Sequence, residues 1–256
     1  MDHLPAKEQA TDRNTVRAVE RALDILLCFG TDRDLGLTEI SSRVSLHKST
    51  VHRLLASLEA KGFVERHQQS DRYRLGWGVL ELASQMFQSD DLVSRVLPEM
   101  TALRDSIGET ISLYVRSGIE RIRIQAIEGV HPVRRVANIG KRFPLYVGAS
   151  GKVLLAFSSD NVLEELRTLG AFPEELDISE LKLQCDHIRQ VGYAVSIEER
   201  EVGAAAVAAP IFDRQHKCIA ALSVSGPVDR YTPSEVIHFA KSCMDTSEAI
   251  SRYLGL

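Results

Sequence analysis

Hydrophobic positions in the first part of the chain recur at the spacing of amphipathic helices. Apolar residues three or four apart predict a first helix that runs from a cap at Asn14 or Thr15 to about Phe29. The Gly-Thr-Asp sequence that follows breaks this pattern, and Thr38 is a candidate cap for a short helix over residues 39–44. Two helices separated by a loop are therefore expected at the start of the folded chain.

The next segment predicts a tight turn, a longer helix and two strands. The turn lies at residues 45–46, and the helix ends at Lys61-Gly62, because glycine suits the left-handed position that follows a helix. Residues 63–66 and 72–75 read as short strands around a polar turn. The order helix, helix, tight turn, helix and β-hairpin predicts a winged helix-turn-helix.

Beyond a further helix over about residues 78–88, helical and strand-like patterns follow one another in irregular order. Helices are expected at about residues 92–107, 151–157, 179–191 and 233–253, with others within 159–169. Strands are expected at about residues 110–116, 121–127, 134–136, 193–196, 204–211 and 219–224. This order is typical of an α+β domain with a largely antiparallel sheet flanked by helices.

The pattern divides the chain of 256 residues into four parts. These are a disordered arm (1–14), a winged helix-turn-helix (15–78), a linker helix (79–91) and an α+β domain (92–256). Hydrophobic residues make up 44% and charged residues 26% of the chain, which excludes a wholly disordered protein. The longest apolar run, residues 203–212, is far shorter than the ~20 residues of a membrane span.

Cysteine spacing and the polar N-terminus bear on compartment and cofactors. Four widely scattered cysteines favour buried thiols in a reducing cytoplasm, and the first residues do not resemble a signal peptide. The nearest pairs of possible metal ligands, Cys185 with His187 and His216 with Cys218, lack the spacing of a metal knuckle. We therefore expect no metal and no cofactor.

Charge is distributed unevenly, although the whole chain has a net charge of −4. Residues 38–74 hold seven Lys and Arg against four Asp and Glu, so a polyanion site is expected there. Within the helix of residues 46–62, an apolar stripe is formed by Val51, Leu54, Leu55 and Leu58. The opposite side of that helix carries cations, hydroxyls and an imidazole in its N-terminal half.

This arrangement favours contacts with nucleic acid. Lys, Ser, Thr and helix N-terminal amides suit phosphates, whereas Arg and His suit base edges. The candidate DNA contacts are Thr38, Lys48, Ser49, Thr50, His52 and Arg53, with Arg66, Arg72 and Arg74 on the hairpin. An ordinary solvated amphipathic helix is the alternative for this segment. The tight turn before it and the basic hairpin after it favour DNA.

Several stretches resemble the IclR-type bacterial transcriptional regulators. TEISSRVSLHKSTVHRLLASLEAKGFVER followed by DRYRLGWGVLELA is similar to their DNA-binding half. FPLYVGASGKVLLAF, GYAVSIEEREVGAAAVAAPIFD and IAALSVSGPVDRYT are similar to their effector domain, so the resemblance covers about residues 15–255. Ser45 and His47 stand where the family often has Gly and Pro, so the base preference does not transfer.

The second domain contains a turn that is suited to an anion. Gly148-Ala149-Ser150-Gly151-Lys152 is not a phosphate-binding loop, since Tyr146 and Val153 depart from that pattern at both ends. Free amides at the start of the following helix still favour a carboxylate, although a strand–helix turn without a ligand is the alternative. Ser223 and Ser225, two apart on a strand, share one face and form either a satisfied polar pair or a ligand cradle.

The resemblance implies a small-molecule pocket around this turn. Its residues are Phe143, Ala149, Ser150, Ser196, Ala204, Ala206, Ser223 and Ser225, and the free amides add Gly151. We expect a small organic acid larger than glyoxylate, with its carboxylate on the Ala149–Gly151 turn and no Arg or Lys required. Phe143 and residues 204–206 are the expected apolar walls. Ser196 and Ala206 depart from relatives that bind small oxo-acids, so the identity of the ligand does not transfer.

Together these observations predict a ligand-responsive transcription factor that binds double-stranded DNA at a partly palindromic operator. The resemblance implies a homodimer or homotetramer, which the apolar face of the first helix and residues Trp77, Leu80, Leu82 and Phe87 support. Two alternatives stay open: an enzyme fused to a regulatory winged helix, and a module that binds protein. Residues 198–201 read as a solvated loop or a lid over the pocket.

Overall fold

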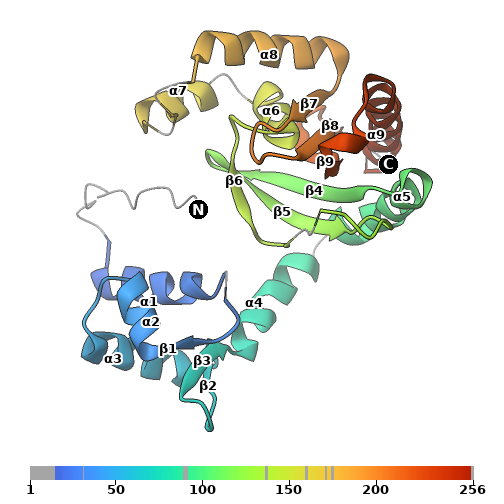
Figure 1. Ribbon diagram of the computed structural model, residues 1–256. Helices are drawn as coiled ribbons and strands as arrows, with labels where there is room; N and C mark the ends of the chain where they lie inside the picture. The colour runs from blue at the N-terminus through green and yellow to red at the C-terminus, as the bar shows by residue number, and fades with distance from the viewer. Residues whose placement is uncertain are drawn as a thin grey trace. The chain divides into compact units, whose positions relative to one another are not determined.

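The chain forms two compact units, Met1–Asp91 and Leu92–Leu256. The computed structural model describes residues 15–30, 32–88, 92–135, 138–158, 161–170, 172–173 and 176–254 (Figure 1). The expected disordered arm, residues 1–14, lies outside the described residues. No helix in the described part of the chain is both long enough and apolar enough to cross a membrane.

The first unit is a winged helix-turn-helix. Its elements are α1 (Arg17–Leu27), a 3-10 turn (Cys28–Gly30), β1 (Leu35–Gly36), α2 (Leu37–Arg43), α3 (Lys48–Ala60), β2 (Val64–Arg66), β3 (Arg72–Leu75) and α4 (Trp77–Gln88). The strands form an antiparallel sheet in the order β1-β3-β2. The predicted hairpin is thus joined by β1, a strand of two residues that is too short to give a periodic pattern.

Two helix caps differ from the sequence prediction. The residue that precedes α1 is Val16, which makes no side-chain cap hydrogen bond, rather than Asn14 or Thr15. Thr38 lies inside α2, and the helix begins after Gly36, whose N–H donates to Glu39 Oε2 at 2.7 Å. The Glu39 carboxylate, at the third position of the helix, thus satisfies the backbone N–H of the residue that precedes the helix.

Helix α3 has a buried stripe and an exposed side. Val51 and Leu55 of α3 are buried in a core that also contains Ile25, Phe29, Leu35, Ile40, Val64 and Tyr73. The tight turn before α3 has Ser45 in the left-handed region, with φ of 50°, and Gly62 takes φ of +75° after the helix. These two turns orient α3 so that its polar side faces solvent.

The second unit is an α+β domain. Its elements are α5 (Leu92–Ile107), β4 (Thr110–Ser117), β5 (Glu120–Ile127), β6 (Arg142–Pro144), α6 (Ala149–Ala156), α7 (Asn161–Thr168), α8 (Ile178–Val191), β7 (Ala194–Ile197), β8 (Ala204–Phe212), β9 (Cys218–Pro227), a 3-10 turn (Val228–Arg230) and α9 (Pro233–Leu254). The strands form one antiparallel sheet in the order β6-β5-β4-β9-β8-β7.

One predicted strand is replaced by another. Arg134 and Arg135 lie in no strand, and Val136, the third residue of that prediction, lies outside the described residues. The sheet edge is formed instead by β6, which pairs Phe143 directly with Arg121 of β5. Three residues carry too little pattern to reveal such an edge strand, because their place depends on a partner far away in the chain.

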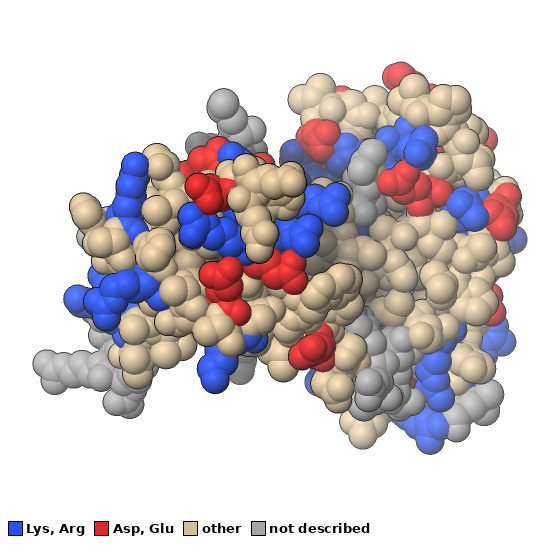
Figure 2. All heavy atoms as spheres, turned by 90° about the horizontal axis from the view of Figure 1, so that it is seen from below, with Lys and Arg blue, Asp and Glu red and all other residues tan. Residues whose placement is uncertain are grey.

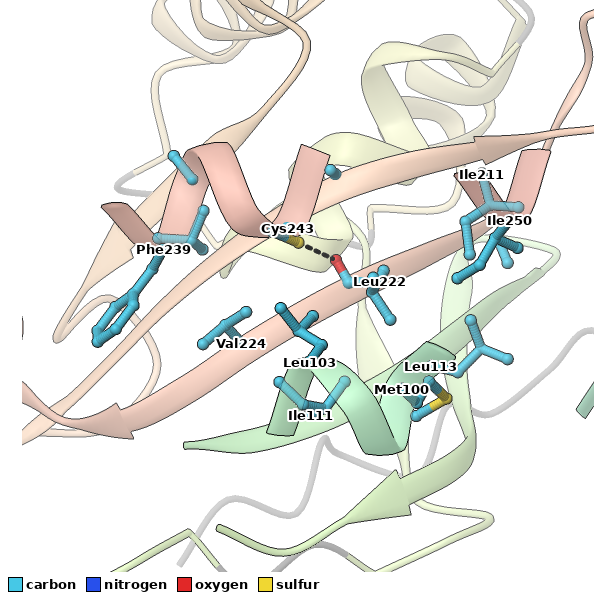
Figure 3. Close-up of a cluster of buried hydrophobic side chains, with 14 of the residues drawn as sticks. Met100, Leu103, Ile111, Leu113, Ile211, Leu222, Val224, Phe239, Cys243 and Ile250 are labelled. Atoms are coloured by element: carbon cyan, nitrogen blue, oxygen red, sulfur yellow. Dashed lines mark hydrogen bonds between the residues drawn. The ribbon is translucent and has the colours of Figure 1, made fainter. Parts of the chain in front are cut away.

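Alternation along the strands gives the sheet two different faces. Large apolar residues on one face pack against α5 and α9, as Figure 3 shows for Met100, Leu222 and Phe239. Within this core the Cys243 thiol donates to the Leu222 carbonyl oxygen at 3.5 Å. Burial of such side chains contributes about 25 cal/mol per Å² of apolar surface, so this core stabilises the domain.

The other face of the sheet carries small residues. Ala194, Ala208 and Ala221 lie there, and α6 and α8 cover them (Figure 1). Every residue of α6 is buried. Small side chains allow the start of α6 to approach the strands closely, and they leave a polar hollow beside it.

We expect Glu39→Ala to destabilise the first unit in a pH-dependent way. The Gly36 N–H, with a smaller contribution from the Arg72 guanidinium, lowers the pKa of Glu39 below its ordinary value. A carboxyl group whose pKa is lower in the folded chain than in the unfolded chain stabilises the fold at pH values above its unfolded pKa. This stabilisation is lost as the pH falls through its folded pKa.

Urea unfolding should therefore show a lower midpoint for the variant at pH 7, and a difference that shrinks below about pH 4.5. Glu59→Ala, an exposed position on α3, is the matched control and should behave like the wild type. A midpoint difference for Glu39→Ala that does not depend on pH contradicts the capping role.

Candidate functional site

The exposed side of α3 presents two cations that have no ion-pair partner. Lys48 and Arg53 are exposed and form no salt bridge with any residue in the described part of the chain. Ser49 and His52 are also exposed, and Thr50 is half-buried. The ring Nδ1 of His47 lies 2.8 Å from Ser49 Oγ, so this serine is held at the first turn of the helix.

Two arginines of the hairpin are paired with neighbouring carboxylates. Arg66 contacts Asp71 at 2.9 Å and Arg74 contacts Glu65 at 2.9 Å, and the arginines of both pairs are partly exposed. On the face shown in Figure 2, Lys and Arg side chains are interspersed with Asp and Glu. Exposed pairs of this kind are worth ~0–1 kcal/mol, so a phosphate can compete for either guanidinium.

Arg72 instead connects parts of the first unit. Its Nη2 donates to Glu39 Oε2 at 2.7 Å and to the Asp34 carbonyl oxygen at 2.9 Å. Thr38 is exposed beside Glu39 on α2. These contacts hold β3 against the start of α2, so Arg72 has a structural role that the sequence pattern did not indicate.

A small cavity lies on the polar face of the second unit's sheet. Seven of the nine residues expected from the sequence line it: Ala149, Ser150, Ser196, Ala204, Ala206, Ser223 and Ser225. Phe143 and Gly151 are not among the lining residues. The cavity volume is about 40 Å³, and on the same measure one water takes about 10–15 Å³. The space therefore suits a compact ligand.

Four arginines that the sequence prediction omitted also line this cavity. They are Arg121 and Arg123 of β5, Arg135, and Arg200 of the loop between β7 and β8. The sequence prediction named no Arg or Lys for this pocket, and the structure places four arginines there. A signal was present in the sequence, since Arg121 and Arg123 alternate with isoleucines and so share one face of a strand.

Phe143 lies behind the arginines and is not an apolar wall of the cavity. The Arg200 guanidinium carbon is 4.4 Å from the centre of the ring, and those of Arg121 and Arg123 are 5.3 and 5.4 Å from it. Aromatic faces attract guanidinium groups at such distances. The ring therefore helps to hold three cations in place.

Arg121 is almost completely buried, with 1% of its surface exposed. Its guanidinium donates to the Pro144 carbonyl oxygen and lies against Gly148 and Gly151 at the start of α6. A Cβ atom at Gly151 would collide with this group, which explains the glycine there. Burial lowers the pKa of Arg121 to about 10, so the side chain stays charged at neutral pH.

Hydrogen-bonding capacity in the pocket is only partly used. Arg121 Nε is buried without a partner among the described residues. The Tyr114 hydroxyl accepts from Arg123 Nε at 2.9 Å and from Nη2 at 2.5 Å. Arg200 is close to Arg135 and Arg123, and its pKa is lowered mainly by burial and further by these two cations.

Of the glutamates within residues 198–201, Glu201 lines the pocket, and Glu199 contacts the residues at the start of α6 beside it. Glu199 accepts from the Gly148 N–H at 3.0 Å and from Lys152 Nζ at 2.5 Å. Glu201 pairs with Arg135 at 2.7 Å, and this hydrogen bond lowers the pKa of Glu201. The Gly148 amide, next to the turn expected to hold a ligand, is thus already occupied by a carboxylate of the protein.

The serines of the pocket differ in what they can donate. Ser223 Oγ donates to the Val207 carbonyl oxygen at 3.1 Å, so its proton is already used. Ser150, Ser196 and Ser225 make no side-chain hydrogen bond within the described residues, and all three residues line the cavity. Strand register aligns Ser196 with Ala206 and Ala206 with Ser225 in one row.

The described residues contain no cluster of three or more His, Cys, Asp or Glu side chains that could hold a metal ion. Cys185 and Cys243 are buried, and burial raises the pKa of Cys218 and of Cys243 to about 12. Thiols of this kind are poor ligands and poor nucleophiles, because only the thiolate reacts.

Comparison with known proteins decides the family. The family described as "IclR helix-turn-helix domain" matches residues 18–68, and that described as "Bacterial transcriptional regulator IclR C-terminal" matches residues 84–252. The chain belongs to the IclR family. The predicted family, the α+β fold with an N-terminal helix-turn-helix, and a regulator rather than an enzyme are all confirmed.

Individual relatives match along nearly the whole chain. The transcriptional regulator KdgR of Dickeya chrysanthemi is 32% identical over 94% of this chain and 81% of its own length. XynR of Escherichia coli is 33% identical over 94% of this chain and 98% of its own length. A crystal structure of an IclR regulator from Alicyclobacillus acidocaldarius has a TM-score of 0.80 at 27% sequence identity. The match covers 94% of this chain and 100% of that one. This IclR-family chain therefore has a helix-turn-helix DNA-binding domain and a C-terminal effector domain.

We expect Glu199→Gln to destabilise the effector domain. The substitution leaves Lys152, whose side chain is 8% exposed, without its carboxylate partner. Losing one partner of a buried charged pair costs about 1–3 kcal/mol or more, and the partial exposure of Glu199 favours the lower end of that range.

Urea unfolding of the full chain measures this change in the free energy of unfolding. Glu165→Gln, an exposed position on α7, is the matched control and should change the free energy by less than about 0.5 kcal/mol. Equal values for the two variants would show that the Glu199 contact does not stabilise the domain.

Proposed function

We propose that this IclR-family regulator acts in the cytoplasm, binds a partly palindromic DNA operator through α3, and responds to a small organic acid. The observation that carries the DNA proposal is the pair of unpaired cations on the exposed side of α3, Lys48 and Arg53. A recognition helix enters the major groove with its N-terminal residues toward the bases. Ser49, Thr50 and His52 complete this surface.

The hairpin supplies further phosphate contacts. Arg66 and Arg74 form only exposed ion pairs, so they exchange a carboxylate for a phosphate at little cost. Thr38 lies at the exposed start of α2, where a hydroxyl suits a backbone phosphate. Arg72 contributes mainly by fixing the position of the hairpin through Glu39.

The effector proposal rests on the buried arginines and the start of α6. Arg121 and the amides of Ala149 and Ser150 are the proposed donors for one carboxylate. Ser225 and Ser196 provide free hydroxyl donors, whereas Ser223 offers lone pairs only. The small side chains of Ala204 and Ala206 leave room for the ligand. Phe143, which does not line the cavity, orients the arginines through its ring.

The assembly proposal is a homodimer or homotetramer. Helix α1 exposes Val19, Leu23 and Leu27 at helical spacing, and α4 exposes Trp77 and Leu80. Leu82 is also exposed on α4, and the Phe87 side chain lies outside the described residues. Apolar stripes of this kind mark protein interfaces. Ligand binding would change the spacing of two DNA-binding units through the linker helix near Trp77.

We expect Lys48→Ala and Arg53→Ala to weaken operator binding without changing stability, because both side chains project away from the core. Each lost phosphate contact should reduce the salt slope of binding by about one, and a lost base contact costs ~1–3 kcal/mol. Gel shifts on operators found by genome-wide binding-site mapping, repeated at several salt concentrations, provide the measurement.

Lys182→Ala, an exposed position on α8, is the control and should bind like the wild type. Unchanged binding by both α3 variants would remove the recognition-helix assignment. An absence of salt dependence would favour the alternative in which the winged helix binds protein.

We expect the protein to be larger than its 28.4 kDa monomer in solution, and Leu23→Glu to reduce that mass. The buried glutamate would destabilise an apolar interface on α1. Light scattering over a range of concentrations measures the change, with Ile237→Glu on α9 as an exposed control. A wild-type monomer at every concentration contradicts the proposed assembly.

A further inference from the structure

A groove that is separate from the small cavity lies between α8 and the strand β7. Leu183, His187 and Val191 of α8 line it, and their spacing of four residues places them on one face of the helix. Tyr193, just before β7, and Val195 of β7 also line it. The volume of the groove is about 470 Å³, against about 40 Å³ for the small cavity. Ligand sites are typically about 300–1,000 Å³, so the groove has room for a small organic molecule.

The outer edge of β7 presents unpaired backbone groups to this groove. Within the described residues β7 is the last strand of its sheet, so only one of its edges is paired, and that edge faces β8. The Glu198 N–H donates to the Ala204 carbonyl oxygen on the β8 side. Backbone groups of successive residues alternate between the two edges of a strand. The N–H and the carbonyl oxygen of Val195, three residues before Glu198, therefore point away from β8.

A buried ammonium group lies at the same residue of β7. Lys152 of α6 lines the groove, and its Nζ donates to the Val195 carbonyl oxygen at 3.2 Å and to Glu199 Oε1 at 2.5 Å. An ammonium group has three N–H donors, so one of them has no acceptor within the described residues. The Val195 N–H, on the same strand edge, has no strand partner either. Two donors with unused capacity thus lie next to each other.

The other polar groups of the lining are exposed. Glu180, in the first turn of α8, is the one carboxylate among the described lining residues, and it accepts from Gln184 Nε2 at 3.2 Å. His187 is exposed as well, whereas Ile188 and Val191 extend the apolar wall. Water screens the charge of an exposed carboxylate more than that of a buried group. The groove therefore combines apolar walls with one buried cationic donor.

We propose that this groove is a second ligand site, which binds a monocarboxylic acid with an apolar body. The carboxylate accepts from Lys152 Nζ and from the Val195 N–H, and hydrogen bonds to an ammonium group favour an anion over a neutral acceptor. The apolar body packs against Ile188, Val191 and Tyr193. The groove shares no lining residue with the small cavity, so this inference does not rest on the effector proposal.

Matched ligands test the two requirements on the full-length chain. Calorimetric titration at neutral pH would compare phenylacetate, phenylbutyrate, octanoate and decanoate, each with its alcohol, and would include acetate and butyrate. We expect at least one of the larger acids to bind tenfold or more tightly than its alcohol and than butyrate. Equal binding of the alcohols contradicts the role of the two donors, and equal binding of butyrate contradicts the apolar contact. Binding by none of the larger acids overturns the proposal.

Two substitutions that add the same charge to α8 locate the bound acid. Leu183→Asp places a carboxylate in the groove, whereas Gln190→Asp places one outside the lining, and both positions are exposed. We expect Leu183→Asp to weaken binding of the best acid at least tenfold, through repulsion and loss of an apolar contact. Gln190→Asp should bind like the wild type. Equal affinities for the two variants place the acid elsewhere and overturn the assignment.

Glu199→Gln gives a readout of the opposite sign. Glu199 is the carboxylate that Lys152 already contacts, so its removal leaves the ammonium group with less compensation. We expect the variant to bind the best acid several-fold more tightly than the wild type, with no change for the matched alcohol. Unchanged or weaker binding of the acid shows that its carboxylate does not contact Lys152 and overturns the proposed site.

Discussion

The alternation of side chains across the six-stranded sheet is the constraint on which the effector domain depends. Val207, Leu222 and Val224 point to one face and form a core with α5 and α9. The residues between them are alanine or serine, so the other face has space for α6 and for a cavity. One sheet therefore has an apolar core on each side, and a polar hollow lies beside the core that contains α6.

Buried positive charge is the main energetic cost in that hollow. Arg121 is buried beside other arginines, and such an arrangement is unfavourable unless each guanidinium has partners. Phe143, Tyr114 and Glu201 supply part of this compensation through ring and hydrogen-bond contacts. The four guanidinium groups that line the pocket are the basis for proposing that it takes an anion.

In the DNA-binding unit the distribution of ion pairs separates structural arginines from free cations. Arg72 connects the hairpin to α2 through Glu39, whereas Lys48 and Arg53 have no ion-pair partner within the described residues. A cation that is already paired in the fold gains less from a phosphate than a free one. This difference is the reason for proposing the exposed side of α3 as the DNA-binding surface.

Local patterns by themselves determined much of this protein. Period-3.6 stripes predicted α1 and α3, the glycine at position 62 predicted the end of α3, and strand-like apolar runs predicted β8 and β9. The resemblance to IclR regulators indicated seven of the residues that line the cavity. The arginines of the pocket and the short strands β1 and β6 were decided only by the tertiary structure. Arg121 meets Phe143 and Gly151 because β5 pairs with a distant strand, and no local pattern encodes that pairing.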